Sequence, residues 1–122
     1  MDTSSQSSDF GGRERRAHPR ANLDLDVNIG RENMPVLPVT ALNLSASGIY
    51  CVSRKSLGEL SRVDLLLKID AEHETTARAV VIREEQLADG NYGIGLFFTS
   101  ISDESRALIA ETVARALDRA GS

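Results

Sequence analysis

A two-residue alternation runs through Asn22-Leu23-Asp24-Leu25-Asp26-Val27-Asn28-Ile29. In an extended chain, successive side chains point to opposite faces, so the apolar residues of this stretch share one face and the polar residues share the other. A strand of this kind buries one face against a core and leaves the other in water. The stretch therefore predicts a half-buried β-strand.

Further extended segments, separated by turn residues, follow at 36–44, 49–53, 63–69, 75–85 and 92–99. Pro38 in the first of them suggests an edge position or a bulge. The period then changes: Ser102 is suited to cap a helix, apolar residues recur at helical spacing, and Gly121 would stop the helix. The pattern predicts a mainly β fold: a small barrel of about six antiparallel strands over 21–99, with a helix over 102–120 packed against it.

The composition is that of one soluble globular domain, with 122 residues, of which 41% are hydrophobic and 26% charged. The net charge of −4 argues against a general nucleic-acid binder, which usually carries a basic surplus. No apolar run is long enough to insert into a membrane, and the polar N-terminus has no secretory signal, so we expect a cytoplasmic location. The Ser-rich residues 1–12 are predicted to be a disordered tail.

The residues that usually carry catalysis or bind metals are scarce in this sequence. His18, His73 and the single Cys51 do not form a metal-ligand cluster, and Cys51 lies in a strand, where we expect it to be buried. Ser45 has no evident histidine base to activate it as a nucleophile. We therefore expect a binding protein that is not an enzyme and has no metal and no cofactor.

Positive charge is concentrated in an arm of residues 13–20, which contains Arg13, Arg15, Arg16 and Arg20 against the single Glu14. A guanidinium group can hold a phosphate, or the O6 and N7 acceptors of guanine, through two parallel hydrogen bonds. On an acidic protein, such a segment suits a small anionic ligand. Taken alone, however, it is more often an ordinary solvated basic patch.

A second polar segment, Asn43-Leu44-Ser45-Ala46-Ser47-Gly48, lies between two predicted strands, with the loop itself expected over 45–48. Asn43 and Ser45 offer short donors and acceptors suited to the edge of a base, and Gly48 permits a close backbone approach. Leu44 would point into the core and hold the loop in place. These residue types are also the usual formers of an ordinary turn.

Together and in this order, the two segments resemble the PilZ domain family. Arg16 and Arg20 match its RxxxR motif, and Asn43, Ser45 and Gly48 match its [D/N]xSxxG motif. The segments 77–83 and 92–98 are similar to late strands of the family's barrel. The resemblance runs from about Arg13 to the end and implies a PilZ domain over 13–122, with a six-stranded antiparallel barrel, a C-terminal helix and a flexible N-terminal arm.

The ligand that this resemblance implies is cyclic di-GMP. Arg16 and Arg20 would grip guanine edges and phosphates, Asn43 and Ser45 would hydrogen-bond a guanine, and Gly48 would let the loop approach. Arg15 directly precedes the first motif, where a basic residue tends to accompany a stacked ligand dimer in the family, so Arg15 is expected to bind as well.

The expected function is a cyclic di-GMP receptor whose arginine arm becomes ordered on ligand binding and which then signals to an unidentified effector protein. The alternative is a PilZ-fold adaptor that acts through protein contacts without binding a nucleotide. A nucleic-acid binder that uses the arm is opposed by the acidic balance and by the scarcity of aromatic residues, which are 4% of the chain.

Overall fold

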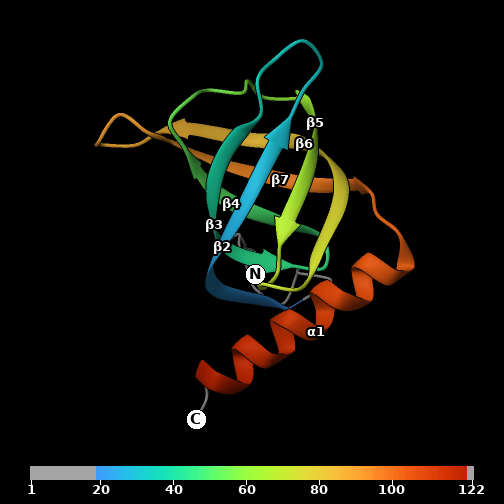
Figure 1. Ribbon diagram of the computed structural model, residues 1–122. Coiled ribbons are helices and arrows are strands. Elements are labelled where there is room, and N and C mark those ends of the chain that lie inside the picture. The colour runs from blue at the N-terminus through green and yellow to red at the C-terminus, as the bar shows by residue number, and fades with distance from the viewer. Residues whose placement is uncertain (1–18, 121–122) are drawn as a thin grey trace, which may run out of the picture.

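The computed structural model describes residues 19–120, which form a closed barrel of six strands and one helix. The elements are β2 (Arg20–Gly30), β3 (Leu37–Ser45), β4 (Gly48–Ser53), β5 (Arg62–Lys68), β6 (Glu74–Gln86), β7 (Tyr92–Ser100) and α1 (Asp103–Ala120). The strands close in the order β2-β3-β4-β7-β6-β5, and every neighbouring pair is antiparallel. The predicted six-stranded antiparallel barrel with a C-terminal helix is confirmed (Figure 1).

The alternation in β2 places its apolar residues as predicted. Leu25, Val27 and Ile29 are buried in the barrel, whereas Asp24 and Asp26 are exposed. The pairing of β2 with β3 shifts between Asn22 and Leu25, and Leu23 within this bulge is only half-buried. The two-residue alternation alone therefore predicts which side chains of β2 face the core, except at the bulge.

The barrel interior is filled almost entirely by aliphatic side chains. Its fully buried members include Val27, Ile29, Leu44, Cys51, Leu65, Leu67, Val81 and Ile94. Leu44 points into this core, as predicted, and so does Cys51. Burial raises the pKa of the Cys51 thiol to about 12, so the sulfur behaves as a small apolar group.

Helix α1 covers the end of the barrel at which β2 begins (Figure 1). Ser102 caps the helix, because its hydroxyl accepts a hydrogen bond from the Ser105 N–H at 3.0 Å. One face of α1 buries Ile109, Val113 and Ala116 against the barrel. The predicted amphipathic helix is therefore present, with Ser102 as its cap.

The connection between β4 and β5 buries Leu57 against the barrel core, and Glu84 of β6 holds it there. The Glu84 carboxylate accepts the N–H groups of Leu57 at 2.8 Å and Gly58 at 3.0 Å, as well as the Ser56 hydroxyl. Burial would raise the pKa of Glu84, but these hydrogen bonds outweigh that effect and the pKa is lowered. Arg31 adds a hydrogen bond to the Leu57 carbonyl at 2.8 Å.

Two local features refine the sequence prediction. The segment expected to be a loop over 45–48 is a tight hairpin, because β3 runs through Ser45 and β4 begins at Gly48. Pro38 lies in a stretch of β3 that pairs with β2 alone, since the pairing with β4 starts at Thr40. A proline is tolerated best in such a stretch, which is paired on one side only.

Candidate functional site

The residues of the second motif meet Arg20 on the outer wall of the barrel. Arg20 lies opposite Ser45 across β2 and β3, and Ser45 lies opposite Gly48 across β3 and β4. Together with Asn43, these residues line one cavity of about 200 Å³. The structure therefore brings together four of the six predicted site residues, whereas Arg15 and Arg16 lie outside the described residues 19–120.

The hydroxyl of Ser45 is engaged within the hairpin. Its side chain is buried, and its Oγ accepts the Ser47 N–H at 3.2 Å and lies 3.0 Å from the Ser47 Oγ. The Gly48 carbonyl oxygen is 3.4 Å from the same hydroxyl. A serine that bonds the backbone two residues ahead fixes the shape of the turn, so Ser45 shapes this edge of the cavity.

Gly48 is required by its neighbour in the barrel. A Cβ atom at this position would lie 2.2 Å from the Leu96 carbonyl oxygen of β7 and 3.3 Å from the Phe97 Cα. Backbone atoms in a paired strand cannot move aside, so only glycine fits. The close approach that the sequence suggested is therefore made to β7.

The two-residue turn between β3 and β4 is also held from outside the hairpin. The Phe98 N–H of β7 donates to the Ser47 carbonyl at 2.9 Å. Arg106 of α1 donates to the Ala46 carbonyl at 3.3 Å. The turn is therefore fixed by both the barrel and the helix, which gives the cavity a rigid rim.

Sequence reasoning identified only four of the twelve residues that line this cavity. Three further lining residues are Ser47 and the buried Ile49 and Leu96. The remaining ones are Tyr50, Ile82, Arg83, Gly95 and Phe97. The sequence offered one signal, at Arg83. Strict alternation in the strand 75–85 would place this charged side chain inside the apolar barrel, which indicates that the alternation breaks before it. A bulge in β6 instead leaves Ile82 unpaired and turns Ile82 and Arg83 to the outer face.

The charge of the cavity is suited to an anion. Arg20 and Arg83 contribute to its lining, and no carboxylate does so among the described residues. Arg83 forms an ion pair with Glu85 at 3.6 Å, in which both side chains are largely exposed. Such a pair is weak, so a ligand can recruit the guanidinium at little cost.

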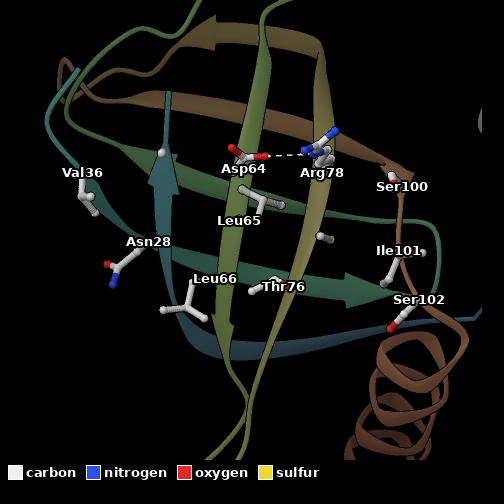
Figure 2. A pocket seen from close by; sticks show the side chains of 12 residues that line it. Asn28, Val36, Asp64, Leu65, Leu66, Thr76, Arg78, Ser100, Ile101 and Ser102 are labelled. Carbon is white, nitrogen blue, oxygen red and sulfur yellow. Dashed lines mark ion pairs between the residues drawn. The ribbon is translucent and has the colours of Figure 1, made fainter. Parts of the chain in front are cut away.

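A larger hollow, of about 770 Å³, lies over β2, β5 and β6 and contains none of the motif residues. Figure 2 shows Asn28, Leu66 and Thr76 on these three strands, with Ser102 beside the start of α1. The ion pair between Asp64 and Arg78, at 3.5 Å, spans it. Its one arginine is thus already matched by a carboxylate, and the smaller cavity remains the better anion site.

The structure offers little support for other kinds of site. Within residues 19–120, no three His, Cys, Asp or Glu side chains are placed to share a metal ion. His73 instead contacts the carboxylate of Asp70 at 2.8 Å. None of the described helices is long and apolar enough to span a bilayer.

Comparisons with known proteins agree with the barrel fold and with the family resemblance. The model of the PilZ domain matches residues 14–115. MotI/DgrA, an inhibitor of motility from Bacillus subtilis, superimposes with a TM-score of 0.77 at 22% identity over 86% of this chain and 52% of its own. The PilZ domain of Escherichia coli YcgR, solved with c-di-GMP, superimposes with a TM-score of 0.70 at 13% identity, over 87% of this chain and 94% of its own.

The MrkH–c-di-GMP complex from K. pneumonia gives a TM-score of 0.73 at 19% identity, covering 88% of this chain and 53% of MrkH. The present chain thus spans about half the length of MotI/DgrA and of MrkH. No curated protein sequence is significantly similar to it.

Proposed function

This chain belongs to the PilZ domain family, whose model covers residues 14–115, and on that premise we propose that it is a receptor for cyclic di-GMP. The proposal rests on one observation: Arg20, Asn43 and Gly48 line the same cavity. Among the described residues, no carboxylate lines that cavity. Two structural neighbours, YcgR and MrkH, were solved with this ligand, which supports the same choice.

The ligand contacts are assigned by the chemistry of each side chain. Arg20, at the start of β2, presents a guanidinium that can bind a phosphate or the O6 and N7 edge of guanine through two hydrogen bonds. Asn43 supplies an amide donor and acceptor for a base. The contacts of Ser45 within the hairpin favour a role in shaping the site, and the need for Gly48 against β7 favours the same role for it.

Arg15 and Arg16 are proposed to complete the site from the arm, with Arg15 contacting a second ligand molecule of a stacked dimer. The cavity of about 200 Å³ is smaller than the 300–1,000 Å³ typical of sites that enclose a whole ligand, so additional contacts are needed. We propose that binding orders residues 13–19 against the barrel. The ordered arm and rim would then present a surface to an effector protein, without catalysis.

Isothermal titration of the purified chain with cyclic di-GMP tests this proposal. Each of Arg16→Ala and Arg20→Ala is expected to weaken binding about 10- to 100-fold, the loss of a charge-assisted hydrogen-bond pair. Arg62→Ala is the control, because it removes the same charge from a strand on another part of the barrel. Thermal unfolding of each variant checks that the fold is retained.

Two outcomes would contradict the site or the function. Unchanged affinity for cyclic di-GMP in both Arg16→Ala and Arg20→Ala would show that the RxxxR motif does not contact the ligand. Absence of any heat with the wild-type chain would favour the adaptor that acts through protein contacts alone. Hydrogen exchange of residues 13–19 with and without ligand tests the ordering of the arm, and equal exchange in both states would refute it.

A further inference from the structure

Three glycines face outward beside the candidate site: Gly48 of β4 and Gly93 and Gly95 of β7. A Cβ atom added to each would have different neighbours. At Gly48 a Cβ would strike the Leu96 carbonyl at 2.2 Å, and at Gly93 it would strike the Tyr50 hydroxyl at 2.0 Å. At Gly95 its nearest atoms would be the Arg83 Cβ at 3.7 Å and the Ile82 Cγ1 at 3.8 Å, which are ordinary contacts. The β7 backbone thus requires glycine at position 48, and the Tyr50 side chain fills the space at Gly93, whereas the space above Gly95 is left open by the described residues.

Gly95 forms an open floor with walls on several sides. It pairs with Tyr50 on one side and with Arg83 on the other, and all three line the cavity. Phe97, the next outward residue along β7, is 47% exposed, and the bulge in β6 leaves Ile82 58% exposed. A glycine within a strand often marks a place where a ligand approaches the backbone.

We propose that this floor is the seat of one guanine base of cyclic di-GMP, an inference that rests on the proposed function. The exposed faces of Phe97 and Ile82 offer apolar contact to a flat ring, and an aromatic side chain can stack on it. Arg83 stands at the rim, where its planar guanidinium can donate two hydrogen bonds to the O6 and N7 atoms of guanine. Gly95, Ile82, Arg83 and Phe97 therefore select the base, although neither motif includes them.

Gly95→Ala tests the floor without threatening the fold, since the added methyl meets only ordinary contacts. A base in van der Waals contact with the floor would be displaced, and we expect titration with cyclic di-GMP to show binding about 5- to 150-fold weaker, the range for loss of a stacked base. Gly30→Ala is the matched control, because its Cβ would have a single neighbour, the Asp64 carbonyl oxygen at 3.9 Å.

Arg83→Ala tests the rim against an equally matched control, Arg78→Ala. Both arginines lie on β6, and both pair with a carboxylate, Arg83 with Glu85 at 3.6 Å and Arg78 with Asp64 at 3.5 Å. Their side chains are 75% and 77% exposed. The two variants therefore change the net charge equally, and a loss of affinity of about 10-fold or more in Arg83→Ala alone would indicate direct contact. Arg83→Lys is expected not to restore affinity, because lysine lacks the planar fork.

The outcomes separate this inference from the proposed function. If Arg20→Ala loses binding while Gly95→Ala and Arg83→Ala bind as tightly as their controls, the base seat is refuted and the receptor function stands. Full affinity in Arg83→Lys would refute recognition of the guanine edge. If the wild-type chain does not bind cyclic di-GMP at all, both proposals are overturned.

Discussion

Gly48 shows how a residue of the [D/N]xSxxG motif can be required by the fold itself. Its Cα faces the β7 backbone so closely that a methyl group would lie 2.2 Å from the Leu96 carbonyl oxygen. Gly48 therefore serves to hold the hairpin against β7, whatever it does for a ligand. Ser45, whose hydroxyl bonds the turn, likewise holds the hairpin.

A Gly48→Ala substitution should accordingly destabilise the protein rather than merely weaken binding. Overpacking of this kind costs about 1–3 kcal/mol or more, because strand backbone must shift. Urea unfolding measures the loss, with Gly30→Ala as the control, because the same methyl group would there make only an ordinary contact with the Asp64 carbonyl oxygen at 3.9 Å. A Gly48→Ala variant as stable as that control would show that β7 can move away.

At the scale of elements, the connection between β4 and β5 depends on one carboxylate. Glu84 accepts two backbone N–H groups and one hydroxyl from residues 56–58. We expect Glu84→Gln to lower the free energy of unfolding by about 1 kcal/mol at pH 7, since the hydrogen bonds lose their charge-assisted part. Chemical unfolding at several pH values measures this difference.

The pH dependence of that difference has a definite sign. The folded pKa of Glu84 is lowered from its ordinary value of 4.5, so the carboxylate stabilises the fold above that value. The stabilisation is lost as the pH falls through the folded pKa, and the wild-type and Glu84→Gln stabilities should converge in acid. A difference that stayed constant from pH 7 into acid would contradict the role of the charge.

Helix α1 makes its contribution through one buried face. Ile109 is fully buried between the helix and the barrel, so Ile109→Ala should cost about 2–5 kcal/mol of unfolding free energy. Leu117→Ala is the control, because Leu117 on the same helix is 40% exposed and should cost far less. Equal losses in thermal unfolding would show that the helix docks through a different face.

Strands and the helix could be predicted from the sequence wherever the spacing of apolar residues was regular. Alternation located β2 and β5, and helical spacing after Ser102 located α1. Arg83 could not be placed, because the bulge in β6 reverses the face that alternation assigns to it. The link from Glu84 to Leu57 was equally hidden, since it joins residues 27 positions apart and no local pattern encodes such a contact. Of the residues that line the cavity, the sequence motifs therefore named Arg20, Asn43, Ser45 and Gly48 but none on β6 or β7.

At the scale of the whole molecule, charge sets which anions can bind. The chain carries a net charge of −4, so it should repel a long polyanion even though one cavity is lined by arginines. We expect no binding of a fluorescently labelled DNA duplex in anisotropy measurements at physiological salt. Binding that weakened steeply with added salt would contradict this expectation and indicate phosphate contacts along the duplex.

The closed order of the six described strands determines how a partner can recognise this protein. An open sheet leaves an unpaired row of N–H and C=O groups at its edge, and another chain can add a strand to it. Here β2 and β5, which would be the two borders of an open sheet, pair with each other over Asp26–Gly30. Strand addition therefore has no continuous template among the described strands, and a protein that bound this barrel would have to recognise side chains rather than a free sheet edge.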